Sequence, residues 1–143
     1  MILDALTLFS DAQAVTATAA STNSLDMGAA RNLGVGQELF VFVTVDVALT
    51  DSSSDSTIAV SLEGDSTTAF TPDGTQALFT IPALAAVGSK YFARVAPDFA
   101  ANFRYLQLKY TAANGDLTTG SFTAGIVVGI DKVTNFAKNY TVS

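Results

Sequence analysis

Apolar side chains in this chain recur at every second position over several segments, and the clearest of these runs from Gln37 to Leu49. Because successive side chains of a strand point to opposite faces, this spacing predicts extended strands and not helices. The side chains expected to face the core from this segment are Leu39, Val41, Val43, Val45 and Val47. The other face carries Phe40 and Phe42 among polar residues.

Three further segments show the same alternation and predict strands. Their expected inward side chains are Ile58, Val60 and Leu62, then Leu106, Leu108 and Tyr110, and finally Phe122, Ala124, Ile126, Val128 and Ile130. Shorter candidate strands are Ala12 to Ala20, Gln76 to Ile81, Lys90 to Val95 and a piece at Asp26 to Gly28. Seven or eight short strands separated by turn-forming residues are typical of a β-sandwich or a barrel.

One turn signal favours a particular strand pairing. Asn114-Gly115 separates the last two long candidate strands, and both residue types tolerate a positive φ. We therefore expect these two strands to pair as a hairpin.

Composition restricts the chemistry of the chain. Its 143 residues include neither histidine nor cysteine. A Ser-His-Asp relay, a thiolate nucleophile, a Cys-ligated metal and a disulfide are therefore excluded. A glycosidase needs only two carboxylates, but nothing in the sequence pairs two of them. We predict a single domain over residues 1–143 that is not an enzyme and holds no cofactor.

Charge argues against several classes of partner. The net charge is -6, and the seven basic residues form no stripe, so nucleic-acid binding is not expected. The apolar runs are too short for a membrane span, and the first twenty residues lack a signal-peptide pattern. Five carboxylates lie close together in sequence without the ligand spacing of a calcium loop, so we interpret them as solvated loop charges and predict no metal. They are Asp51, Asp55, Glu63, Asp65 and Asp73.

A strand with apolar side chains on both faces needs a covering layer on each face. Phe40 and Phe42 therefore require a covering segment of the same chain or a second protein. The segments 1–11 and 132–143 carry apolar anchors and are candidate docking arms. The candidate partner-binding residues are Leu3, Leu6, Phe9, Phe40, Phe42, Phe136 and Tyr140.

The order of several segments resembles a known family. These are Leu3-Asp4-Ala5, Leu8 to Val15, Ser21 to Gly28, Gly36 to Val41, Leu78 to Tyr91 and Phe103 to Tyr110. The chain resembles the cement proteins that decorate the heads of short-tailed bacteriophages of the Bordetella-phage type. The first three segments are the specific part of the likeness, and the others follow a general β pattern.

This resemblance implies a fold and a role. The implied fold is all-β, a jelly-roll-like β-sandwich of about eight antiparallel strands with little helix. The implied role is that of a homodimer on the capsid exterior that bridges neighbouring major capsid proteins, without catalysis, cofactor or small-molecule substrate. The expected location is the virion, after synthesis in the host cytoplasm.

An alternative from another class is a carbohydrate- or receptor-binding β-sandwich module. Such modules bind sugars with exposed aromatic rings. Its ring platforms would be Tyr91, Tyr105 and Tyr110. Sugar or ion binding favours this alternative, whereas association with phage heads favours the cement role.

Overall fold

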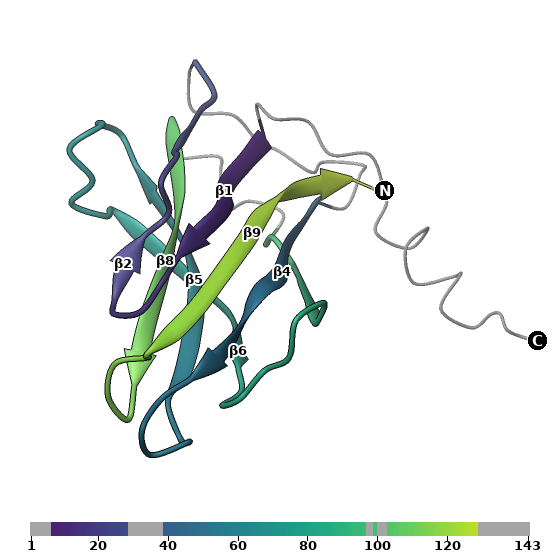
Figure 1. Cartoon of the computed structure of the whole chain (residues 1–143). Coiled ribbons are helices and arrows are strands. Elements are labelled where there is room, and N and C mark those ends of the chain that lie inside the picture. Colours follow the sequence, from purple (N-terminus) through teal and green to yellow (C-terminus); the bar gives the residue numbers. More distant parts are fainter. Residues whose placement is uncertain (1–6, 29–38, 97–98, 100–102, 129–143) are drawn as a thin grey trace, which may run out of the picture.

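The structure is a computed structural model, and it describes residues 7–28, 39–96, 99 and 103–128. These residues form nine strands in two antiparallel sheets (Figure 1). The strands are β1 (Leu8–Ala14), β2 (Ala19–Ala20), β3 (Leu25–Asp26), β4 (Leu39–Thr50), β5 (Thr57–Asp65), β6 (Gly74–Ile81), β7 (Lys90–Arg94), β8 (Tyr105–Ala113) and β9 (Thr119–Val128).

The strand order is that of a jelly roll. The first sheet has the order β1-β9-β4-β7, and the second has β2-β8-β5-β6, with β3 also paired to β8. The pairs β1 with β9, β2 and β3 with β8, β4 with β7, and β5 with β6 are nested within one another along the chain. Pairing of β9 with β4 joins the strands of the first sheet, and pairing of β8 with β5 joins those of the second. The predicted all-β sandwich is confirmed.

The core lies between the sheets and consists largely of the side chains that the alternation placed there. The rings of Tyr110 and Phe122 meet across it at a centroid distance of 5.4 Å. Each fully buried aliphatic side chain contributes roughly 1.5 to 3 kcal/mol. The predicted inward residues found in the core are Val41, Val43, Val45, Ile58, Val60, Leu62, Leu106, Leu108, Tyr110, Phe122, Ala124 and Ile126.

Val47 departs from this pattern, because 47% of its surface is exposed. The pairing of β4 with β9 changes register between Val45 and Val47 and again between Val47 and Thr50. Such an irregularity re-aims the side chains of the bulged strand. The prediction that Val47 faces the core is therefore wrong, while Leu49 beyond it is buried.

The predicted hairpin is also wrong. Asn114 and Gly115 do adopt positive φ angles of 65° and 104°. However, β8 lies in the second sheet and β9 in the first, so the turn carries the chain from one sheet to the other. A tight reversal fixes the direction of the chain but does not oblige the flanking strands to pair.

The amino-terminal strand differs from the sequence-based expectation in position. β1 covers Leu8–Ala14 instead of Ala12 to Ala20, and β2 is a separate short strand. Residues 8–11 of the predicted docking arm are thus part of the first sheet. The strands expected at Gln76 to Ile81 and Lys90 to Val95 are confirmed as β6 and β7.

Candidate functional site

A second apolar cluster lies on the outer face of the first sheet, away from the core. We call it the apolar outer face, and it consists of Leu8, Phe40, Phe42, Phe92 and Val127. Phe42 is 2% exposed, and Leu8, Phe40 and Phe92 are partly buried against it. The four strands of the sheet contribute to it, so it is a property of the sheet and not of one loop.

Register brings these side chains together. Phe42 of β4 is opposite Phe92 of β7 on one side and Gly125 of β9 on the other. Leu8 of β1 is in turn opposite Gly125. Cross-strand neighbours on one face of a sheet contact each other. The ring of Phe42 therefore lies between Phe92 on one side and Gly125 on the other.

The absence of a side chain at Gly125 makes this packing possible. A Cβ at position 125 would lie 3.0 Å from Cε1 of Phe42 and 2.8 Å from the backbone oxygen of Thr7. Real Cβ atoms essentially never approach another atom to 2.8 Å, and 3.0 Å is tighter than most real Cβ contacts. The glycine therefore leaves the space that the phenylalanine ring and the start of β1 occupy.

Charged side chains border the apolar outer face. Lys90 and Arg94 of the edge strand β7 are opposite Thr44 and Phe40 of β4, on the same face as Phe92. Charges on an edge strand discourage uncontrolled pairing with another sheet. Beyond the cluster, the hydroxyl of Thr123 donates a 2.6 Å hydrogen bond to Asp46.

The outer face of the second sheet is different in character. Its side chains are mainly small or polar: Ala59, Ser61 and Glu63 from β5, with Tyr105, Gln107, Lys109 and Thr111 from β8. An antiparallel sheet normally keeps one polar face toward water. Only the first sheet breaks this rule in the described part of the chain.

A smaller exposed apolar set lies at the turn between β6 and β7. Leu84 and Val87 are 53% and 65% exposed, and Val47 is near them because this turn bonds to β4. The contacts are from the amide of Leu49 to the oxygen of Ala85 and from Gly88 to Val45. The sequence does not reveal this set, since the register change that exposes Val47 leaves no signal in the alternation.

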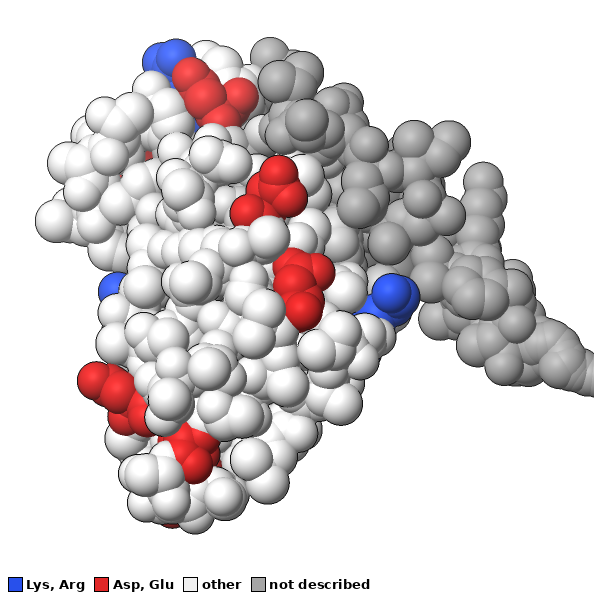
Figure 2. Space-filling model, in the orientation of Figure 1, with Lys and Arg blue, Asp and Glu red and all other residues white. Residues whose placement is uncertain are grey.

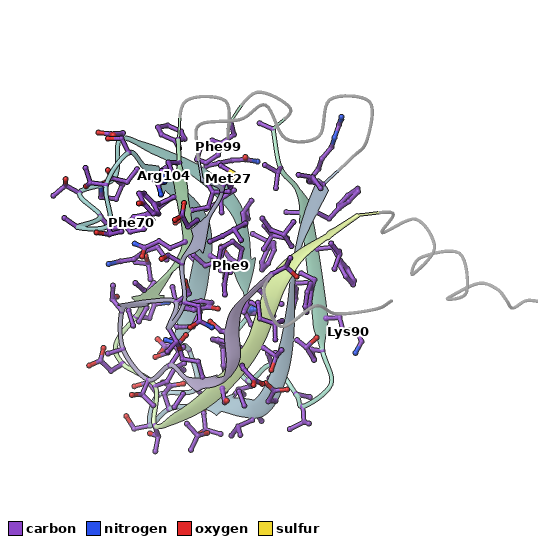
Figure 3. All side chains as sticks on the ribbon, turned by 90° about the horizontal axis from the view of Figure 1, so that it is seen from above. Phe9, Met27, Phe70, Lys90, Phe99 and Arg104 are labelled. Atoms are coloured by element: carbon purple, nitrogen blue, oxygen red, sulfur yellow. The ribbon has the colours of Figure 1, made fainter. Side chains whose placement is uncertain are left out.

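The structure divides the predicted partner-binding residues into three groups. Phe40 and Phe42 lie together on the apolar outer face. Phe9 does not, because it is 1% exposed and packs in the core between the sheets (Figure 3), which corrects its interpretation as a docking residue. The others lie outside the described residues: Leu3, Leu6, Phe136 and Tyr140.

Two members of the apolar outer face were not predicted, namely Phe92 and Val127. Leu8 belongs to the segment 1–11, which was expected to supply apolar anchors able to cover Phe40 and Phe42, and it does pack in this cluster. Phe92 lies between Lys90 and Arg94 at alternate positions, so its face of β7 reads as a charged one. Val127 lies opposite to the inward stripe of its own strand. Only the pairing of strands places them beside Phe42.

The tyrosine platforms of the carbohydrate-binding alternative are not available as a set. Tyr110 is fully buried in the core, and Tyr91 packs against the core and stacks on Phe79 at 5.8 Å. The guanidinium of Arg104 lies 5.0 Å above the half-buried ring of Tyr105. The prediction that these three rings form an exposed sugar platform is therefore wrong.

The clustered carboxylates serve as caps within loops. Asp51 accepts hydrogen bonds from the backbone amides of Ser53, Asp55 and Ser56. Desolvation raises the pKa of Asp51, but these amides outweigh it and the net pKa is lowered. Within the described ranges, no three His, Cys, Asp or Glu side chains form a group that could hold a metal ion.

Charge on the surface is sparse. Figure 2 shows a largely uncharged face on which acidic side chains are spread separately and basic ones are few. The ion pair of Arg104 with Asp26, at 2.9 Å, is exposed, and it lowers the pKa of Asp26. The described residues include no helix with the length and apolar character that a bilayer crossing requires.

The chain matches a known protein family. The model of the family Bbp16 matches residues 9–126, which extend from β1 into β9 and so cover both sheets. No curated protein matches the chain.

Proposed function

Because the chain belongs to the Bbp16 family, whose name indicates a Bordetella phage protein, we propose that it is a non-catalytic cement protein of the bacteriophage head. In this role it binds the outer surface of the shell and bridges neighbouring major capsid proteins. It acts by contact alone and uses no cofactor and no small-molecule substrate.

The observation that carries this proposal is the apolar outer face of the first sheet. Phe40 of β4 and Phe92 of β7 are partly exposed on this outer face and pack beside Phe42, which is itself 2% exposed. Apolar surface rimmed by charged side chains is typical of protein–protein contact sites. Lys90 and Arg94 supply that rim along β7.

A bridging role also explains how modest contacts can suffice. A homodimer that docks on two coat subunits keeps one contact in place while the other opens, so the released site rebinds at a high effective concentration. A specific interface needs roughly 1,000 Å² or more of buried surface. The apolar outer face and the Val47, Leu84 and Val87 set together offer contact area at two places.

The direct test is co-sedimentation of the purified protein with empty phage heads. Phe92→Gln on the edge strand β7 replaces an apolar ring of the face by a polar side chain of smaller area. We expect this variant to lose at least about tenfold in apparent affinity, which corresponds to about 1.4 kcal/mol. Ala59→Gln, on the exposed outer face of the second sheet, is the matched control and should bind as the parent does.

Thermal unfolding of both variants ensures that a loss of binding reflects the surface and not the fold. Equal binding by a folded Phe92→Gln protein, or failure of the parent protein to sediment with heads, would contradict the proposal. Sedimentation equilibrium of the free protein tests the homodimer separately. If the protein is a monomer at all concentrations, a single chain would have to contact both coat subunits.

A further inference from the structure

A cavity of about 420 Å³ lies on the outer side of the second sheet, on the opposite side of the sandwich from the apolar outer face. The sheet forms its floor, the chain around β2 and β3 forms one wall, and the loop between β5 and β6 forms the other. Figure 3 shows Phe70 of this loop and Lys90 of β7 on opposite sides of the molecule. Its volume falls in the range of roughly 300 to 1,000 Å³ that is usual for small-molecule sites.

The floor presents hydrogen-bonding groups of both kinds. Glu63 of β5 is opposite Gln107 of β8, and the Gln107 amide donates a 2.9 Å hydrogen bond to Glu63 Oε1. Lys109, two residues along β8, points to the same face and lines the cavity. No described residue pairs with its ammonium group. A carboxylate acceptor, an amide and a free ammonium donor therefore lie side by side.

The loop wall supplies an aromatic ring. Phe70 and Pro72 line the cavity, and Phe70 has a φ of 45°, which is costly for a bulky residue. The surrounding loop is tied at its start, where the Thr67 amide donates to Asp65 Oδ1 at 2.8 Å. At its end, the Ser66 hydroxyl donates to Asp73 at 3.2 Å. These bonds hold the ring at the cavity despite the backbone strain.

The chemistry of the lining selects a ligand class. One carboxylate and one ammonium cancel in charge, while Thr22, Thr68 and Gln107 add neutral polar groups. An apolar cofactor would leave these groups unpaired, which costs free energy. A sugar offers neighbouring hydroxyls that both donate and accept, together with a C–H face that packs on an aromatic ring.

We propose that this cavity binds a neutral carbohydrate. Glu63 accepts hydrogen bonds from sugar hydroxyls, Lys109 and Gln107 donate to them, and the ring of Phe70 packs against the sugar face. The site goes beyond the cement role and does not depend on it. On a head to which the protein docks through the first sheet, the cavity would face the medium.

The test uses the free protein, labelled and applied to an array of neutral and acidic bacterial oligosaccharides, with each positive sugar then titrated by calorimetry. We expect saturable binding to neutral glycans. Glu63→Gln keeps the shape of the side chain and should weaken binding at least tenfold, as should Phe70→Ala. Thr111→Ala, on the same face of β8 but outside the cavity, should bind as the parent does.

Three results would overturn the carbohydrate site. The first is no binding to any neutral glycan, either on the array or in calorimetry at millimolar sugar. The second is equal binding by Glu63→Gln and the parent, and the third is a preference for acidic glycans. Glu63→Gln should still co-sediment with phage heads as the parent does. Loss of the sugar site and loss of the cement role are therefore separate outcomes.

Discussion

Tyr110 of β8 and Ser10 of β1 join the two sheets through a 2.7 Å hydrogen bond between their buried hydroxyl groups. The hydroxyl of Ser10 gives its single proton to Gln13 Oε1 at 2.7 Å, so Tyr110 is the donor to Ser10. The Gln13 amide in turn donates to the oxygen of Ala20. This chain of bonds ties the edge of the first sheet to the second.

Removal of the Tyr110 hydroxyl should weaken the sandwich modestly. In Tyr110→Phe the ring still fills the core, and Ser10 keeps its bond to Gln13. We therefore expect a loss of about 1 kcal/mol in the free energy of unfolding, measured by urea denaturation. Tyr105→Phe, at a half-buried ring, is the control and should change stability by less. Equal effects of the two substitutions would show that the buried bond contributes nothing.

The same tyrosine should make stability fall at high pH. Burial raises the pKa of Tyr110 from 10.0 to about 12. Below pH 10 the hydroxyl is protonated in both the folded and the unfolded chain, so it has no effect on the pH dependence. Between pH 10 and 12 the unfolded chain releases the proton first, which favours unfolding by about 1.4 kcal/mol for each pH unit.

The measurement for this prediction is the difference in unfolding free energy between the parent and Tyr110→Phe across that range. The difference should shrink and reverse as the pH rises, because the variant has no proton to release at this position. A difference that stays constant from pH 9 to 12 would contradict a raised pKa.

Gly125→Ala should destabilise the protein although alanine is usually the better strand residue. The added Cβ meets the ring of Phe42 and the backbone oxygen of Thr7 at distances that require movement. Overpacking of this kind costs roughly 1 to 3 kcal/mol. Urea denaturation of Gly125→Ala, Phe42→Ala and the double variant should show a smaller cost for the double variant than the sum of the two. Simple additivity would exclude a clash with the Phe42 ring as a cause of the destabilisation.

Phe103 and Gly64 provide a second double-variant test, at a glycine of the second sheet. A Cβ on Gly64 would lie 2.4 Å from the ring of Phe103, and one on the paired Gly74 would be equally close. Gly64→Ala alone should therefore destabilise the protein. Phe103→Ala should cost about 3 kcal/mol, the lower end of the range for phenylalanine, because the ring packs against the core but is only partly buried.

In the Phe103→Ala background, Gly64→Ala should become neutral or stabilising, since its methyl group enters space that the ring has left. Chemical denaturation of the four proteins gives the coupling energy directly. If Gly64→Ala costs the same with and without the ring, the two residues do not share that space.

Much of the fold could be predicted from the sequence because burial imposes a two-residue period on each strand. That period correctly placed Val41, Val60 and Leu108 in the core. It fails at Val47, where the register of β4 changes, and it gives no information about which strands pair. The nested order of the jelly roll depends on contacts between distant segments, and the turn at Asn114 was consistent with either arrangement.

The candidate docking surface could be predicted only in part for the same reason. Phe40 and Phe42 stand out because they occupy the face opposite a strong apolar stripe. Phe9 carries the same chemistry, yet its position in β1 turns it into the core. Glu63 and Gln107 are far apart in sequence and become neighbours only when β5 pairs with β8.

The pairing of β1 with β9 sets the order of events during synthesis. Leu8 is synthesised before the other described strands, whereas its partner Gly125 is among the last of the described residues to be made. Until then the first strand has no neighbour in its sheet, and the closing contact carries the entropic cost of a loop that contains nearly the whole sandwich. β1 must therefore wait until β9 has been synthesised, and chaperone protection during that interval would act on β1.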